Sequence, residues 1–167
     1  MVSRHGIEIN PGKIKAITEM PTPTKGKEIQ GFLGRINFIN RFILQLTDKC
    51  KPIFKLLRKG FEKTWNEDCQ GAFDTIKKCL LNPPVLVPPE PRCPLLLYLL
   101  VLDNSMGCVL GQYDRIERKE HAIYYLSKRF IESKSRYSLL ERTCCALAWA
   151  TTRLRHYLLS YTVYLIA

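Results

Sequence analysis

Six prolines within twelve residues constrain the fold of this 167-residue chain more than any other feature. They stand at positions 83, 84, 88, 89, 91 and 94. Each proline fixes its own φ angle and restricts the residue before it, so the run favours an extended backbone and excludes a helix. Apolar residues recur at helical spacing before the run and form continuous strand-like runs after it. The sequence therefore predicts a helical part, a linker at 83–94 and a strand-rich part.

Four helices are predicted before the prolines, at residues 13–19, 28–44, 48–59 and from 67 onward. Thr24 is the expected cap of the second helix and Asn66 of the last. The apolar stripe of the second helix is expected to be buried: Ile29, Phe32, Leu33, Ile36, Ile39 and Ile43. Six aromatic residues are assigned to the core, because large rings are usually buried: Phe32, Phe38, Phe42, Trp65, Phe73 and Trp149.

Strands and one long helix are predicted after the prolines. The apolar runs 95–102, 106–112 and 121–130 are expected to form strands, joined by polar turns. A helix follows over 137–159, with Leu140 and Cys144 among its expected core residues, and a fourth strand begins at Thr162. This order, a three-strand meander, a long helix and a further strand, is the order of the ribonuclease H fold. The whole chain is therefore assigned to the α+β class.

Charge and cysteine content limit the possible partners. The net charge is +11, which suits a polyanion partner but is equally typical of solvated lysine-rich helix faces. The seven cysteines form no C-x-x-C pair, and His5, His121 and His156 stand alone, so no metal site or catalytic triad is predicted. No apolar segment is long enough to span a membrane and no signal peptide is recognisable, so an intracellular protein without a membrane partner is expected.

Eight segments together resemble one protein family. GIEINPGKIKAI, MPTPTKGKEIQGFLGRINFINRFI, PIFKLLRKG, WNEDCQGAFDTIKKCL and PPVLVPP resemble the thumb and connection of the reverse transcriptase in Ty3/gypsy-type retrotransposon Pol polyproteins. LYLLVLDNSMGCVLGQ, HAIYYLSKRF and RYSLLERTCCALAWATTRLRHYL resemble the ribonuclease H-like domain that follows. The resemblance implies four parts: a palm-proximal strand and connector (1–20), a helical thumb and connection (21–82), a Pro-rich linker (83–94) and a C-terminally truncated ribonuclease H-like domain (95–167).

The resemblance also implies that the metal-binding acids of the nuclease are missing. The family's TDASD-x3-GAVL strand pattern places its first metal-binding Asp at Leu100, and its helix pattern places the second acid at Thr143. The third acid would lie beyond Ala167, and no polymerase hairpin with an acidic dyad precedes Gly6. Two-metal hydrolysis needs several convergent carboxylates. No cofactor is therefore expected in this fragment, and Mg²⁺ is expected only for the parent enzyme.

Two neighbouring acids are weak candidates for residual catalysis. Asp103 is expected in the turn after the first strand, where Asp commonly forms local hydrogen bonds. Glu141 is two residues before Thr143, about 200° around a helix, so the two side chains point in different directions. Neither acid is expected to replace the missing metal ligands.

Three functions remain open from the sequence. The first is a non-catalytic connection module that binds an RNA–DNA or DNA duplex alongside the remainder of the Pol polyprotein. Its expected phosphate contacts are Lys25, Lys27, Arg35 and Arg41. The second is a residual ribonuclease H that uses Asp103 and Glu141. The third is a protein-interaction remnant that binds no nucleic acid.

Overall fold

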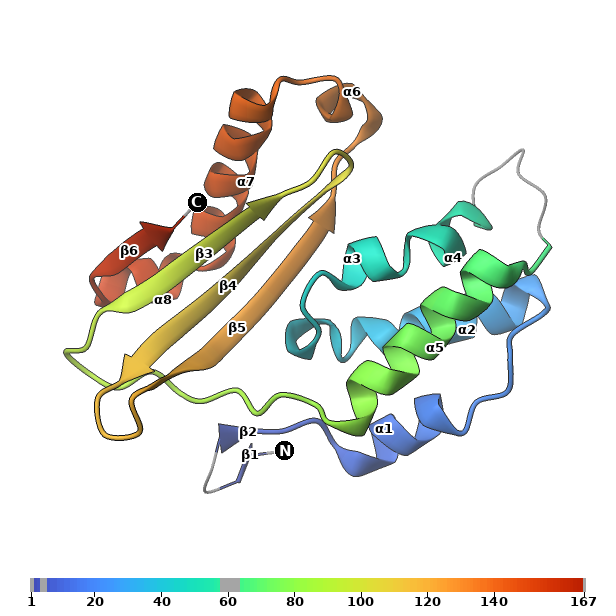
Figure 1. The fold of residues 1–167 in the computed structure, drawn as a ribbon, viewed down its shortest axis with the longest axis horizontal. Helices are drawn as coiled ribbons and strands as arrows, with labels where there is room; N and C mark the ends of the chain where they lie inside the picture. The colour runs from blue at the N-terminus through green and yellow to red at the C-terminus, as the bar shows by residue number, and fades with distance from the viewer. Residues whose placement is uncertain (1, 4–5, 58–63, 167) are drawn as a thin grey trace.

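The computed structural model of the chain describes residues 2–3, 6–57 and 64–166. A helical part lies beside a four-stranded sheet that carries its own helices (Figure 1). The helical part contains β1 (Val2–Ser3), β2 (Gly6–Ile7), α1 (Pro11–Thr18), α2 (Gly26–Asn37), the 3₁₀ helix η1 (Asn40–Phe42), α3 (Leu46–Lys49), α4 (Lys51–Lys55) and α5 (Glu67–Leu81). The sheet part contains β3 (Leu95–Val101), β4 (Ser105–Asp114), β5 (Lys119–Arg129), α6 (Glu132–Ser135), α7 (Leu139–Arg153), α8 (Arg155–Ser160) and β6 (Val163–Ile166).

Packing of α2 against α5 forms the core of the helical part. The rings of Phe32 and Phe73 meet edge to face with centroids 4.9 Å apart, and Trp65 packs on Phe73 at 5.8 Å. The predicted stripe of α2 is confirmed, because five of its members are buried: Ile29, Phe32, Ile36, Ile39 and Ile43. Asn66 caps α5 as predicted, since its side chain accepts a hydrogen bond from the Cys69 amide.

The predicted helix over 28–44 is wrong in its bounds and in its cap. The helix begins at Gly26 and ends at Asn37, because the chain then turns to pack η1 against β5. Thr24 does not cap it: Lys25 is at the N-cap position, and Glu28 reaches back to accept hydrogen bonds from the Thr24 and Lys25 amides. Those bonds also lower the pKa of Glu28, since they favour its charged form.

Two further helix predictions need correction. The segment predicted as one helix over 48–59 forms α3 and α4, which meet at Cys50, and Pro52 fits the first turn of α4. Its predicted end, at residue 59, lies outside the described residues. The helix predicted over 137–159 is likewise divided into α7 and α8 at Leu154. On α7, Leu140 and Cys144 are exposed, not buried.

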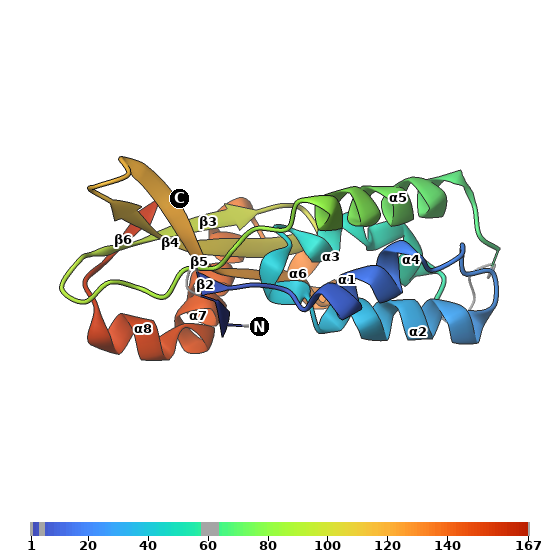
Figure 2. The same cartoon turned by 90° about the horizontal axis from the view of Figure 1, so that it is seen from below.

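The sheet confirms the predicted strand order. Its strands lie in the order β5-β4-β3-β6, with antiparallel pairs β3/β4 and β4/β5 and a parallel pair β3/β6. Side chains alternate between the two faces of a strand. Leu95 and Leu97 pack with Ala150 and Leu154 of the covering helices. Figure 2 shows α7 and α8 together on one side of the sheet.

The Pro-rich segment is extended over 83–90, turns at 91–93, where Arg92 has a φ of 65°, and is bonded to both parts of the molecule. Leu86 exchanges backbone hydrogen bonds with Ile7, and the Val87 amide donates to the Ala122 carbonyl of β5 at 3.0 Å. Gly6 is required at this junction, because its φ is +132° and a Cβ would lie 2.4 Å from the Leu86 carbonyl oxygen. Among the described helices, none is both long enough and apolar enough to cross a membrane.

The α2–α5 core gives the first testable prediction. Phe32→Ala is expected to lower the free energy of unfolding by about 3–5 kcal/mol, because it removes a buried ring and leaves a cavity. Phe38→Ala is the matched control on the same helix: its ring is 68% exposed, so the loss should stay within about 0.5 kcal/mol. Urea unfolding of the variants measures both values. Equal losses would contradict this assignment of the core.

Candidate nucleic-acid interface

The two positions that the resemblance assigns to metal-binding acids lie on different sides of the sheet. Leu100 alternates with the residues that face α7, so its side chain is on the opposite face, close to Gln45 and Asp48. Thr143 is on α7, and its hydroxyl donates to the Leu139 carbonyl at 2.8 Å. The structure therefore does not bring these two positions together.

The two weak catalytic candidates have structural partners. Asp103 lies in the turn between β3 and β4, as predicted, and one carboxylate oxygen is 3.0 Å from Nη1 of Arg142. The Arg142 guanidinium also donates to the Leu102 carbonyl, so a fixed positive charge lies beside the turn. Glu141 closes a capping box at the start of α7, where its carboxylate accepts from the Ser138 amide and hydroxyl, each at 2.8 Å. Neither acid belongs to a group of three or more potential metal ligands among the described residues.

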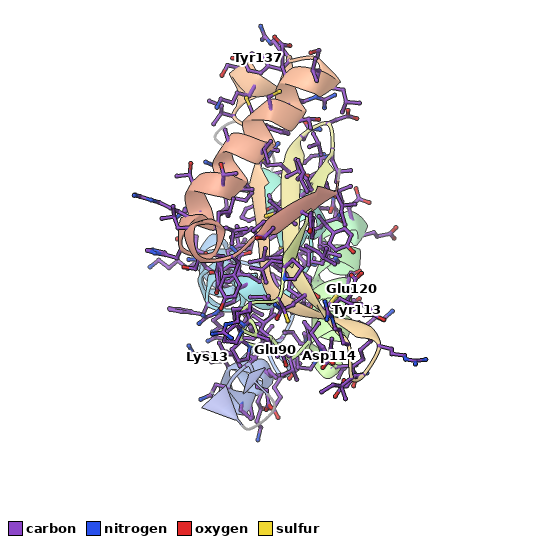
Figure 3. The ribbon with its side chains drawn as sticks, turned by 90° about the vertical axis from the view of Figure 1, so that its left-hand side faces the viewer. Lys13, Glu90, Tyr113, Asp114, Glu120 and Tyr137 are labelled. Carbon is purple, nitrogen blue, oxygen red and sulfur yellow. The ribbon has the colours of Figure 1, made fainter. Side chains whose placement is uncertain are left out.

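Potential metal ligands gather elsewhere, at the β4–β5 hairpin. Within the described ranges, one group of three qualifies: Asp114, Glu117 and His121. Nε2 of His121 lies 3.1 Å from Glu117 and 3.7 Å from Asp114. Figure 3 shows Asp114 at the opposite end of the sheet from Tyr137, which precedes α7. This group is therefore remote from the positions where the resemblance places metal.

The hairpin group was missed because His121 looked isolated in the sequence. Its partners Asp114 and Glu117 are seven and four residues before it, across a predicted hairpin loop, and that spacing is the signal that could have found them. Backbone hydrogen bonds from residues 116 and 117 lower the pKa of Asp114, and a hydrogen bond from Lys119 lowers that of Glu117. These contacts show an ion-paired turn with its acids charged.

The four predicted phosphate contacts are not equivalent in the structure. Lys25 and Lys27 are exposed at the start of α2. Arg35 donates to the Ala16 carbonyl at 3.0 Å, which ties α2 to α1. The guanidinium of Arg41 lies 5.6 Å from the centroid of the Phe42 ring, on η1. Lys25 is beside the Glu28 carboxylate, which accepts a hydrogen bond from its amide, so Lys27 is the one of the four without a contact among the described residues.

The exposed outer face of α2 has few side chains. Lys27, Gly31, Gly34 and Phe38 are spaced at four, three and four residues, so they share one side of the helix, opposite its buried stripe. A Cβ built on Gly31 or Gly34 would meet nothing within 4 Å. Figure 2 shows α2 and α5 on opposite sides of the helical part. The Lys13 ammonium lies 4.7 Å from the Phe38 ring centroid, so this face carries a second cation besides Lys27.

The assignment of Phe38 to the core is therefore wrong. The ring is 68% exposed, because it lies on the polar side of α2, where the helix ends. A signal was present in the sequence: two glycines, three residues apart, interrupt the polar face of a strongly amphipathic helix. Glycine inside a helix costs about 1 kcal/mol relative to alanine. Nothing within the described chain requires these glycines, since a Cβ at either one has open space around it.

The family model for the RNase H-like domain found in reverse transcriptase matches residues 65–165. The chain belongs to this family. It is 33% identical over 160 residues to the Retrovirus-related Pol polyprotein from transposon 297 of Drosophila melanogaster, covering 95% of this chain and 14% of that protein. It is 28% identical to the Transposon Tf2-3 polyprotein of Schizosaccharomyces pombe, covering 94% of this chain and 12% of that protein. The resemblance to Ty3/gypsy-type Pol polyproteins is confirmed, and this chain spans only about a seventh of such a protein.

Solved structures with a similar fold come from reverse transcriptases. The foamy viral protease-reverse transcriptase in complex with RNA/DNA hybrid aligns with a TM-score of 0.80 at 18% identity, covering 98% of this chain and 22% of that one. The complex of the same kind of protein with double-stranded DNA gives 0.79 at 18% identity, covering 98% and 34%. Both confirm the predicted fold class for this RNase H-like chain.

The capping box gives a pH-dependent prediction. Hydrogen bonds from Ser138 lower the pKa of Glu141, so the charged carboxylate stabilises the fold above the pKa of the unfolded chain. That contribution is lost as pH falls through the lowered folded-state pKa. Glu141→Ala should therefore be less stable than the parent at about pH 7, and the difference should disappear toward about pH 2. Urea unfolding across this range measures it. A difference that is constant with pH would contradict the role of Glu141 as a cap.

Proposed function

We propose that this chain is a non-catalytic module of a retrotransposon Pol polyprotein that holds an RNA–DNA or DNA duplex on the outer face of α2. The observation that carries the proposal is the exposed glycine pair on that face, Gly31 and Gly34. Because glycine has no Cβ, a partner can approach the helix backbone more closely at these two positions than it could at an alanine. The wide minor groove of an A-form hybrid offers a matching shallow surface.

Flanking residues supply the contacts that such an approach requires. Lys25 and Lys27 place positive charge at the start of the face and would contact phosphates without reading sequence. The exposed ring of Phe38 lies at the other end, where it can pack on sugars or on an exposed base. The net charge of +11 also attracts a polyanion to the protein as a whole.

The comparisons support the choice of ligand. Similar solved structures are reverse transcriptases in complex with double-stranded DNA and with RNA/DNA hybrid. Curated relatives are Pol polyproteins of transposons. We therefore assign polymerisation, hybrid hydrolysis and the associated Mg²⁺ to other parts of the parent polyprotein. The division at the Pro-rich segment into a thumb-like part and an RNase H-like part belongs to the same proposal.

A nuclease assay separates this function from a residual ribonuclease H. With Mg²⁺ and an RNA–DNA hybrid, the protein is expected to give no cleavage above the protein-free background. Asp103 is paired with Arg142 and Glu141 with Ser138, so no set of convergent carboxylates is available for two metal ions. Cleavage that Asp103→Asn abolishes, with the fold intact, would establish the nuclease instead.

Substitution of the glycines tests the α2 face directly. Gly34→Ala is expected to raise the helix stability by up to about 1 kcal/mol, because alanine is the better helix former and its Cβ has open space. The same Cβ would stand between α2 and the duplex, so affinity should fall by about tenfold or more. Thermal unfolding and fluorescence anisotropy with a labelled RNA–DNA hybrid measure the two effects.

Gly71→Ala is the matched control for this experiment. Gly71 is also an exposed helical glycine with nothing within 4 Å of an added Cβ, but it lies on α5, on the other side of the helical part. The Gly71→Ala variant should gain stability without loss of affinity for the hybrid. Equal binding by the unsubstituted protein, Gly34→Ala and Gly71→Ala would exclude α2 as the interface. If the unsubstituted protein binds no duplex, a protein-interaction remnant is favoured instead.

A further inference from the structure

The hairpin between β4 and β5 brings together three side chains that offer metal-ligand atoms of two kinds. Asp114 ends β4, Glu117 lies in the loop and His121 lies on β5. The strand register pairs Gln112 with His121 and Asp114 with Lys119, so Asp114 and His121 share one face of the two strands. One ligand atom of each of the three lies within 4.8 Å of the other two. A nitrogen and two carboxylates therefore converge from three successive segments.

The turn orients these side chains and leaves ligand atoms free. Oδ1 of Asp114 accepts hydrogen bonds from the amides of Ile116 and Glu117, at 2.6 and 3.0 Å. Its other oxygen, Oδ2, lies 3.7 Å from Nε2 of His121, and the same nitrogen lies 3.1 Å from Oε2 of Glu117. The backbone thus fixes one oxygen of Asp114 while the second faces the imidazole. An imidazole nitrogen with two carboxylates is a ligand set that suits Zn²⁺.

The separations around the imidazole are close to those of a zinc site. Bonds of about 2.0–2.2 Å at tetrahedral angles place neighbouring ligand atoms ~3.4 Å apart. The two distances from Nε2 of His121, 3.1 and 3.7 Å, lie on either side of that value. All three side chains are partly open to solvent. An ion can therefore enter from solution without the large desolvation cost of a buried charge.

A small cavity adjoins the three ligands. It has a volume of about 30 Å³ and is lined by Asp114 and His121 of the hairpin and by Glu90 of the Pro-rich segment. Gln112 holds that segment in place, because its side chain accepts from the Glu90 amide at 2.7 Å and donates to the Glu90 carbonyl at 3.1 Å. Glu90 and Asp114 lie at the same end of the sheet (Figure 3). A cavity of this size accommodates a water molecule.

We propose that Asp114, Glu117 and His121 bind a Zn²⁺ ion, with water as the fourth ligand, and that the ion closes the β4–β5 hairpin. Two carboxylates balance the charge of the ion, and three protein ligands with one water are a common zinc coordination. Lys119 is the competitor, because its ammonium pairs with Glu117. This proposal is independent of the α2 face, since none of the three ligands lies on α2.

Calorimetric titration of the whole chain with ZnCl₂ tests the site. His121→Ala is expected to lower the Zn²⁺ affinity by about tenfold or more. Asp114→Asn should do the same, although the asparagine oxygen can still accept the hydrogen bonds of the turn, so this variant keeps the hairpin. Thermal unfolding is the second measurement: Zn²⁺ should raise the Tm of the unsubstituted protein and leave that of either variant unchanged.

His156→Ala is the matched control, because His156 is exposed on α8 and belongs to no ligand group among the described residues. It should bind Zn²⁺ like the unsubstituted protein. This control also accounts for zinc bound by the cysteines, which His121→Ala leaves intact. Equal Zn²⁺ affinity and equal Tm gain in the unsubstituted protein and in His121→Ala would overturn the proposal, as would the absence of Zn²⁺ binding.

Removal of the competing lysine should have the opposite sign. Lys119→Gln is expected to raise the Zn²⁺ affinity by about fivefold, because the charge that competes for Glu117 is lost. Arg115→Gln makes the same change in charge in the same loop, at an exposed arginine without an ion pair among the described residues, and should raise the affinity less. Equal increases would mean that net charge alone acts, and Glu117 would be rejected as a ligand.

Discussion

The packing of α2 against α5 determines where the other functional features of the helical part lie. Burial of Phe32 against Phe73 sets the rotation of α2 about its axis, so the residues half a turn away must face outward. Gly31 and Gly34 are exposed for this reason, and Phe38 follows them at the helix end. The exposed face is thus a direct consequence of the core.

In the sheet part, the acids next to the positions that the resemblance assigns to metal ligands have structural partners. Alternation along β3 directs Leu100 away from α7, while Arg142 places a positive charge beside Asp103. Glu141 has a structural partner at the helix cap, which explains an acid at this position without catalysis. The same sheet also joins the helical part, where the Thr47 amide donates to the Ser127 hydroxyl of β5 at 3.2 Å. The scaffold role that we propose needs the fold and the register, but no convergent carboxylates.

Periodicity predicted the elements well and their ends poorly. The strand meander, the α5 cap at Asn66 and the buried stripe of α2 were all readable, because each depends on local spacing or a local hydrogen bond. Helix bounds failed where tertiary contacts intervened, as at Asn37, where the chain leaves α2 to pack on β5. His121 looked isolated for a related reason, since only the paired strands bring Asp114 to it.

The sequence by itself determined the family, the fold class and the absence of acids at Leu100 and Thr143, because residue identity and order carry that information. Only the tertiary structure decided that Leu100 and Thr143 lie on opposite sides of the sheet, and that the chain leaves α2 at Asn37 to pack η1 against β5. Those facts depend on how helices rotate and which segments meet. Such contacts join residues that are far apart along the chain, and local spacing does not encode them.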